Sequence, residues 1–387
     1  MSAVRTPPRV DDGLLAELTR RFAATAADLD RSAEFPHQNF AVLHEHRLLG
    51  LTVPEEYGGS GAGLREALRV LSAVAEGEPS TALILFMTYG YYSGAMARTE
   101  HWPREVYARM AREAASEISL IGGLRVEPEL GTPVRGGMPK TTARKTADGW
   151  RIDGTKIYST GSTGLRWYGV WAKTDEPEPR LGTFLVRAGS PGIRIAPAWD
   201  HLGMRATVSH QVTFEDVFTP LDHAVDVRTP DGWARGAGTE GGSLWNALAI
   251  STIYDGVARA ARNWLVRYLP SRVPSNLGTP LSALPRVREK FGEIDALLYT
   301  NRVLLRDAAE RFEAGHGPST VEANLVKFTV TGNAIRAVEI GLELTGNPGL
   351  SRSNPLERHY RDVLCSRIHS PQNDTILVAA GQAAFSV

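Results

Sequence analysis

The chain has 387 residues and a mass of 42.1 kDa, which is enough for two or three domains. Its 43 Lys and Arg residues balance 43 Asp and Glu residues, so its formal net charge is zero and it has no long-range attraction for a polyanion. This balance argues against a nucleic-acid-binding protein, and a hydrophobic share of 42% argues against a disordered one. The single cysteine, Cys365, excludes an intramolecular disulfide and suits a reducing compartment.

Residues 1–117 are predicted to form a helical domain. Apolar residues at helical spacing predict one helix around residues 14–22 and another around residues 64–74, with a turn at the Pro and Gly residues of 53–61 between them. The apolar run 81–90 is too short to cross a bilayer, so we expect a buried helix there. Because the first residues lack the apolar core of a signal peptide, we expect a cytoplasmic protein that does not associate with membranes.

Residues 118–232 are predicted to form a β-domain, because turn-forming residues become frequent and apolar residues alternate or occur in short runs. The predicted strands suggest a small barrel or sandwich, and they cover residues 150–158, 170–173, 183–187 and 212–217. After a glycine-rich linker predicted at 232–242, residues 233–387 are predicted to form a helical bundle. Its helices are expected over residues 244–268, 285–312 and 319–345. The predicted fold class is therefore α+β.

Several widespread catalytic motifs are absent. The sequence has no P-loop, no Rossmann glycine fingerprint, no paired cysteines, no His-Glu-x-x-His motif and no Gly-x-Ser-x-Gly elbow. His44 and His46 would point to different faces of a helix, which suits an exposed pair better than a metal site. We therefore expect no bound metal ion and no serine-hydrolase chemistry.

Segments along nearly the whole chain resemble, in the same order, motifs of the acyl-CoA dehydrogenase superfamily. They are residues 53–59 (VPEEYGG), 153–161 (DGTKIYSTG), 202–209 (LGMRATVS), 214–220 (FEDVFTP), 288–292 (REKFG), 345–349 (TGNPG) and 361–362 (RD). Each motif is weak alone, but their order on a helix–β–helix layout makes the resemblance specific. It implies an N-terminal helical domain, a middle β-barrel or sandwich domain and a C-terminal four-helix bundle, assembled as a homotetramer.

The resemblance also implies a flavin site for FAD or FMN. Thr160 matches the position whose hydroxyl contacts flavin N5, Tyr158 matches the aromatic residue that packs against the ring, and Ser162 lies beside them. Without the resemblance, Tyr158 and Thr160 would be ordinary strand residues, and Arg288 would be an exposed helix charge. The family binds the nucleotide tail of the flavin across a subunit interface, and the matching residues here are Arg288, Phe291, Gly346 and Asn347.

The chain departs from the family at the catalytic base. An acyl-CoA dehydrogenase needs a carboxylate to take the α-proton of its thioester substrate. Ser370 stands at one family position for this carboxylate, and Asn246, ten residues before Gly256, stands at the other. Neither side chain can abstract such a proton. Asp255 could replace the missing base, and we keep it as a minority candidate.

The His-Ser-Pro segment at 369–371 resembles a different branch of the superfamily, the two-component flavin-dependent monooxygenases of the dibenzothiophene monooxygenase type. These enzymes take reduced FMN or FAD from a partner reductase and react it with O₂. They then transfer one oxygen atom from a flavin C4a-(hydro)peroxide to nitrogen, sulfur or aromatic carbon. The resemblance implies that His369 acts as acid or base, and that Ser370 holds the peroxide or the substrate. Outside this register, His369 would be a satisfied histidine at a helix interface.

The resemblance places substrate-facing residues at Arg205, Ser209, Tyr254 and Tyr92. Arg205 could equally be a structural salt-bridge partner, and Tyr92 a core aromatic residue. Val126 replaces a hydroxyl that contacts the flavin pyrimidine edge in the family, which favours weakly held, diffusible flavin. Two other functions stay open: a dehydrogenase or oxidase of acyl-CoA or acyl-carrier-protein thioesters with a displaced base, and a non-catalytic flavin- or acyl-binding protein.

Overall fold

The N-terminal helices bury the apolar stripes that predicted them. The computed structural model describes residues 10–93, 102–130, 137–236 and 240–385. The first helix begins where the Asp11 carboxylate accepts a hydrogen bond from the Leu14 backbone N–H, and it buries Leu18 and Phe22. The elements are α1 (Asp12–Ser32), α2 (His37–Glu45), η1 (Glu55–Tyr57), α3 (Leu64–Gly77), α4 (Pro79–Tyr92) and α6 (Arg104–Ser116). As predicted for residues 81–90, α4 is a largely buried helix.

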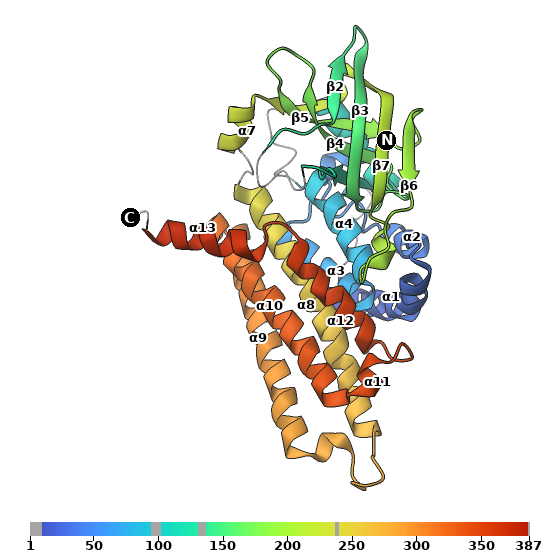
Figure 1. Ribbon diagram of the computed structural model, residues 1–387, viewed down its shortest axis with the longest axis vertical. Coiled ribbons are helices and arrows are strands. Elements are labelled where there is room, and N and C mark those ends of the chain that lie inside the picture. Colours follow the sequence, from blue (N-terminus) through green and yellow to red (C-terminus); the bar gives the residue numbers. More distant parts are fainter. Residues whose placement is uncertain (1–9, 94–101, 131–136, 237–239, 386–387) are drawn as a thin grey trace.

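The middle of the chain forms one sheet, which lies at one end of the molecule (Figure 1). Its strands run in the order β6-β7-β3-β2-β4-β5-β8, and β1 pairs with β4. They are β1 (Ile121–Leu124), β2 (Thr142–Lys145), β3 (Gly149–Ser159), β4 (Trp167–Thr174), β5 (Leu181–Arg187), β6 (Ile193–Ala196), β7 (His210–Pro220) and β8 (Ala224–Arg228). The four predicted strands correspond to β3, β4, β5 and β7. The other four are short or have mixed polarity, so their alternation was too weak to predict them.

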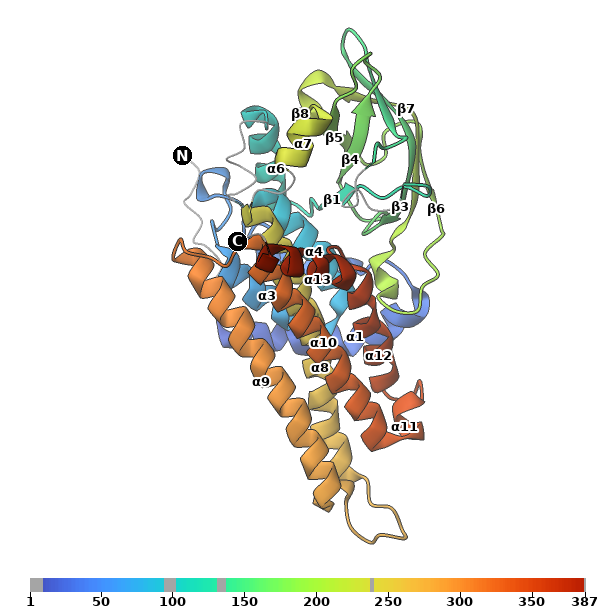
Figure 2. The same cartoon turned by 60° about the vertical axis from the view of Figure 1, so that its left-hand side comes forward.

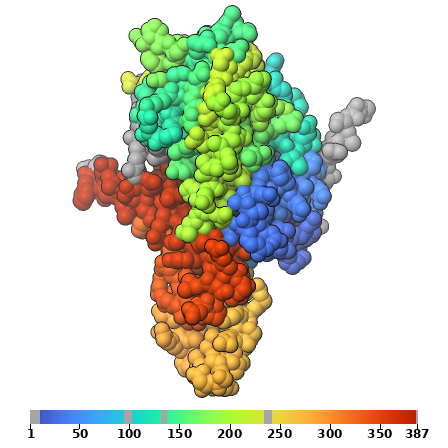
Figure 3. Space-filling view, turned by 45° about the vertical axis from the view of Figure 1, so that its right-hand side comes forward, coloured from blue at the N-terminus to red at the C-terminus, as the bar shows by residue number. Residues whose placement is uncertain are grey.

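The C-terminal helices pack along one another and extend away from the sheet (Figures 1 and 2). The long ones are α8 (Glu240–Ser271), α9 (Pro285–Glu313) and α10 (Thr320–Thr345), and α12 (Leu356–Leu364) packs on α8 and α10. A capping box of Ser319 and Glu322 starts α10. The shorter elements are η3 (Arg205–Thr207), η4 (Leu221–His223), α7 (Pro230–Gly236), η5 (Leu281–Ala283), α11 (Asn347–Leu350), η6 (Cys365–Ile368) and α13 (Asn373–Phe385). The last of these, α13, projects from the side of the body (Figure 3).

The predicted glycine-rich linker is wrong over most of its length. Residues 232–236 belong to α7 and residues 240–242 to α8, while residues 237–239 lie outside the described part of the chain. The predicted boundary between residues 232 and 233 therefore falls inside a helix. Glycine lowers helix propensity, but each glycine costs only about 1 kcal/mol relative to alanine, and tertiary packing can offset that amount.

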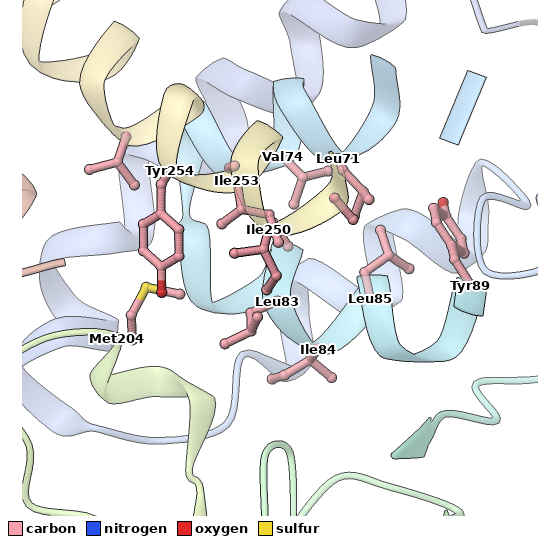
Figure 4. Close-up of a cluster of buried hydrophobic side chains, with 14 of the residues drawn as sticks. Leu71, Val74, Leu83, Ile84, Leu85, Tyr89, Met204, Ile250, Ile253 and Tyr254 are labelled. Atoms are coloured by element: carbon pink, nitrogen blue, oxygen red, sulfur yellow. The ribbon is translucent and has the colours of Figure 1, made fainter. Parts of the chain in front are cut away.

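The three parts of the chain meet around α4, where the loop before β7 packs on α8 and α12. Apolar side chains of α3, α4 and α8 form this junction, and Tyr254 of α8 extends toward Met204 of the loop (Figure 4). Gly203 lets the loop approach α12 closely, because a Cβ atom there would lie 2.4 Å from the Arg361 carbonyl oxygen. In the described ranges, no helix is both long and apolar enough to span a membrane.

Candidate functional site

His369 lies in the turn between η6 and α13, and its ring faces Tyr254 of α8. The His369 Nε2 atom and the Tyr254 hydroxyl are 2.7 Å apart, although the two residues are 115 positions apart in the chain. Burial, and then the charge of Lys327, lower the pKa of His369 to about 4. Burial raises the pKa of Tyr254 well above its ordinary value. At neutral pH the pair therefore consists of a neutral imidazole and a protonated phenol, and the imidazole is able to accept a proton.

The two positions at which the superfamily carries its base lie side by side here. Asn246 of α8 donates a hydrogen bond of 2.8 Å from Nδ2 to the backbone carbonyl oxygen of Ser370. Neither residue brings a carboxylate to this place. The turn that carries His369 is attached to α8 twice, through Asn246 and through Tyr254.

Asp255 follows Tyr254 directly but contacts different neighbours. Successive helix residues point about 100° apart. One carboxylate oxygen of Asp255 accepts from Arg259 Nε at 3.0 Å, and the other accepts from Asn301 Nδ2 at 2.9 Å. Arg259 also pairs with Glu76 of α3 and lines an open groove of about 480 Å³ between α1, α3 and α8. Both oxygens of the Asp255 carboxylate are thus engaged in a network that joins α8 to α3 and α9.

The residues expected at the flavin ring gather at the end of β3. Tyr158 has a left-handed backbone, with φ of 54°, and its side chain is 53% exposed. The Thr160 hydroxyl lies 3.1 Å from that of Ser209, which lies 2.8 Å from that of Thr207. The buried Ser162 hydroxyl donates to the Val208 carbonyl oxygen at 2.6 Å. The structure therefore brings Thr160, Ser162 and Ser209 together around one loop.

Two aromatic residues beside Tyr158, Trp199 and His201, were not predicted from the sequence. Trp199 and His201 stack with ring centroids 3.6 Å apart, and each meets the Tyr158 ring edge to face. An exposed aromatic surface next to a pair of hydroxyls has the shape and the donors that a flat, polar-edged ring requires. These residues fit a flavin: Tyr158 would hold the ring, and Thr160 would hydrogen-bond to its edge. When bound, a flavin would supply two-electron redox chemistry at this place.

The residues expected at the nucleotide tail lie elsewhere. Arg288 is exposed near the start of α9 and donates from Nε to the Ser282 carbonyl oxygen, and Phe291 lies under the guanidinium of Arg262. Gly346 lies between α10 and α11, Asn347 begins α11, and both are exposed. The start of α9 and α11 lie toward the end of the bundle that is remote from β3 (Figure 1). A single chain therefore does not bring the two parts of the expected flavin site together.

Two predicted substrate residues have structural partners. Arg205 donates to the Asp30 carbonyl oxygen at 2.8 Å and to the His201 carbonyl oxygen at 3.1 Å, which ties its loop to α1. Arg205 also forms an ion pair with Asp200 at 3.3 Å, and its role toward the substrate stays a prediction. The ring of Tyr92 is buried against Tyr107, and its hydroxyl has no hydrogen-bond partner among the residues that the structure describes.

Two buried titratable groups near the Tyr254–His369 pair were not predicted as site residues: Lys327 acts on His369, and Asp362 acts on Tyr254. Lys327 of α10 is fully buried and donates from Nζ to the His369 and Pro371 carbonyl oxygens, and burial lowers its pKa to about 8. Asp362 accepts a hydrogen bond from the Met204 N–H at 2.6 Å, and burial raises its pKa to about 7. A signal for Lys327 existed, because it shares the buried helix face of Ala323, Val330 and Ala334.

Comparison with known proteins identifies the family. Models of the N-terminal, middle and C-terminal domains of acyl-CoA dehydrogenase match residues 12–112, 126–217 and 222–374. A putative acyl-CoA dehydrogenase of Bacillus subtilis, YdbM, is 30% identical, with 96% of this chain and 95% of YdbM covered. The chain belongs to the acyl-CoA dehydrogenase family. This membership confirms the predicted fold class and makes the protein a member of a family of flavin-dependent oxidoreductases.

Other relatives are named as a nitrososynthase or were solved with a nucleotide-linked sugar bound. The L-evernosamine nitrososynthase of a Micromonospora species is 28% identical, with 96% of this chain and 89% of that protein covered. A crystal structure of KijD3 with FMN and dTDP-3-amino-2,3,6-trideoxy-4-keto-3-methyl-D-glucose is 27% identical, with a TM-score of 0.82 and coverage of 96% and 92%. No group of three or more His, Cys, Asp or Glu side chains in the described ranges could hold a metal ion.

Proposed function

We propose that the protein is a flavin-dependent monooxygenase that uses reduced FMN or FAD from a partner reductase. In the net reaction, O₂ gives one oxygen atom to the substrate and the other leaves as water, while the reduced flavin is oxidised by two electrons. The flavin-ring residues Tyr158 and Thr160 support a flavin site, and the FMN in the related KijD3 structure supports FMN as one form of the cofactor.

A single observation carries the proposal: both positions for the thioester base hold residues without a carboxylate, and a neutral His369 lies beside them. Asn246 and Ser370 cannot take an α-proton from an acyl thioester. The His369 imidazole is unprotonated at pH 7 and lies within hydrogen-bond distance of the Tyr254 hydroxyl, so the pair can carry away the proton that an amine or phenol loses on oxygenation. The Tyr254 hydroxyl holds the direction in which Nε2 points.

Among oxidation at nitrogen, sulfur and aromatic carbon, we favour nitrogen. The support comes from the likeness to a nitrososynthase named for an amino sugar, and to KijD3 with a nucleotide-linked amino sugar bound. The amine of a nucleotide-linked amino sugar is therefore the first substrate class to screen, before sulfides and phenols.

The test is a stopped-flow experiment in which the protein with pre-reduced FMN or FAD is mixed with oxygenated buffer. We expect a flavin absorbance intermediate that outlives the free-solution reaction, and oxygenated amine in the product analysis. His369→Asn should shorten the life of the intermediate or lower the yield of product. Reoxidation at the rate of free flavin, with no intermediate and no product, would contradict the proposal.

The second candidate is an acyl-CoA dehydrogenase, and the likeness to YdbM over 96% of the chain favours it. This enzyme would purify yellow, and an acyl-CoA alone would bleach its flavin under anaerobic conditions. Asp255→Asn would abolish the bleaching if Asp255 replaced the missing base. A colourless protein that needs a reductase would instead support the monooxygenase.

A further inference from the structure

Lys327 holds the turn that carries His369. Its side chain is fully buried, and its Nζ atom lies 3.0 Å from the His369 carbonyl oxygen and 2.8 Å from the Pro371 carbonyl oxygen. The carbonyl oxygen between these two, that of Ser370, accepts from Asn246 Nδ2. Three successive backbone carbonyl groups are thus held by two side chains, one from α10 and one from α8.

This use of a lysine is costly for stability, so it calls for a reason. A buried ammonium normally needs a carboxylate partner, since burial without one costs several kcal/mol. In the described part of the chain no carboxylate forms an ion pair with Lys327, and its hydrogen bonds go to neutral carbonyl groups. An apolar side chain would suit the buried face of α10 better if packing were its only task.

We propose that Lys327 is a positioning residue, which fixes the 369–371 turn so that the His369 ring stays against the Tyr254 hydroxyl. This inference rests on the monooxygenase function proposed above. Three side chains from two helices hold the turn. Lys327 of α10 donates to the outer two carbonyl groups, and Asn246 of α8 donates to the carbonyl between them. Tyr254, also of α8, hydrogen-bonds to the imidazole. Without Lys327, two carbonyl groups lose their donor and the turn is free to move away from α8.

The charge of Lys327 has a second effect on the same ring. A cation near an imidazole opposes its protonation. Lys327 therefore helps to keep His369 neutral at the pH at which it accepts a proton, besides holding it in place. The groups that face His369 are Tyr254 from α8 and Lys327 from α10.

The experiment combines three variants with two measurements. Lys327→Met removes both the donors and the charge, and Lys327→Gln keeps N–H donors without the charge. Lys145→Met is the control, since Lys145 is exposed on β2 and lies over the ring of Trp150, at the opposite end of β3 from Tyr158. The first measurement is the NMR titration of His369 in protein with ¹³C-labelled histidine, where His369→Asn identifies the signal. The second is the life of the flavin intermediate in stopped flow.

We expect the titration midpoint of His369 to rise by about one pH unit or more in Lys327→Met, because the ring loses both its fixed place and the neighbouring cation. The intermediate should be shorter-lived, and Lys327→Gln should recover part of its lifetime. A folded Lys327→Met with an unchanged midpoint and an unchanged lifetime would overturn the inference. If Lys327→Met does not fold, Lys327→Gln is compared with the wild type. An unchanged lifetime of the intermediate together with an unchanged His369 midpoint would then overturn the inference.

The two measurements separate the inference from the function on which it rests. The NMR titration needs no substrate and no flavin. If the midpoint shifts as expected but the wild-type protein forms no intermediate and no product, then the monooxygenase proposal fails while Lys327 still sets the state of His369. If the wild type does form the intermediate and the variants match it in both measurements, then the positioning role fails alone.

Discussion

At the residue scale, the protonation state of His369 depends on its neighbours more than on its own chemistry. An imidazole in water titrates near pH 6.5. Here burial and the ammonium of Lys327 lower the pKa to about 4, and the partner Tyr254 stays protonated. The hydrogen bond between the two side chains is thus made by two neutral groups, and its value lies in orienting the ring.

Tyr254→Phe tests this hydrogen bond. Removing the hydroxyl leaves a partly buried ring nitrogen without its partner, so we expect the free energy of unfolding to fall by about 1–2 kcal/mol. We also expect a slower oxygenation step, because the imidazole is no longer held. Tyr89→Phe is the matched control, since Tyr89 donates a buried hydrogen bond of 2.7 Å to the Leu48 carbonyl oxygen within the N-terminal helices. If both variants lost equal stability and equal activity, His369 would have no special dependence on Tyr254.

At the scale of the elements, the loop before β7 is the piece that joins the β-domain to the bundle. Its Met204 N–H donates to Asp362 of α12, and its Thr207 hydroxyl donates to the Met204 carbonyl oxygen. Ser209 then continues the chain of hydroxyls to Thr160. The end of β3 that carries Tyr158 and the helix that leads to His369 are therefore connected through one short loop.

Gly203→Ala should disturb this connection. The new Cβ atom would lie 2.4 Å from the Arg361 carbonyl oxygen, and forcing the loop and α12 apart should cost about 1–3 kcal/mol of unfolding free energy. Gly332→Ala is the control, because an exposed Cβ in α10 meets nothing within 4 Å and should be neutral or slightly stabilising. Urea denaturation of both variants measures the difference. Equal urea midpoints for the two variants would show that the loop accommodates the new Cβ atom without a loss of stability.

At the scale of the whole molecule, the expected flavin site is divided. The ring-facing residues end β3, whereas Arg288 and Gly346 lie toward the remote end of the bundle (Figure 1). We propose that a second copy of the chain brings its own bundle end to this β-domain, as a homotetramer would. Sedimentation velocity gives the number of chains, and the division of the site predicts more than one.

Arg288→Ala tests the division through ligand binding. FAD has a pyrophosphate and an adenosine that FMN lacks, so loss of a charge-assisted phosphate contact should weaken FAD binding by about tenfold and FMN binding much less. Arg286→Ala, an exposed neighbour on the same helix, is the control. Flavin fluorescence titrations measure both affinities. An equal loss for the two flavins would place Arg288 away from the nucleotide tail.

The stability of the molecule should also fall in acid through a buried histidine of α12. Burial lowers the pKa of His359 from about 6.5 to about 3. The unfolded chain therefore takes up this proton first as the pH falls, and stability is lost progressively from about pH 6.5 to pH 3. The loss is on the order of 5 kcal/mol. His359→Phe should flatten the stability curve between pH 6.5 and 5, where few carboxylates titrate. Urea unfolding at several pH values measures the unfolding free energy. If its slope against pH is the same in His359→Phe as in the wild type, the role of His359 is contradicted.

Local sequence patterns were enough to predict most of the longer elements and the family. Apolar spacing predicted α1, α3, α8, α9 and α10, because a helix face three to four residues wide must be buried. Alternation predicted the longer strands β3, β4, β5 and β7. Motif order indicated the acyl-CoA dehydrogenase fold, and the same motifs predicted that Asn246 and Ser370 stand at the family positions of the base. These are properties of neighbouring residues, or of residues matched one by one to a known pattern.

Which of these residues meet depends on long-range packing, which no local pattern records. The contact of Asn246 with Ser370 joins residues 124 positions apart, and no local pattern encodes such a distance. Packing of α10 on the C-terminal turn placed Lys327 under His369, and packing of α8 on α3 and α9 gave Asp255 its partners. A side chain acquires its pKa and its hydrogen bonds from whatever the fold packs around it. The chemistry of the site was therefore settled by long-range packing, after the elements had been settled by local sequence.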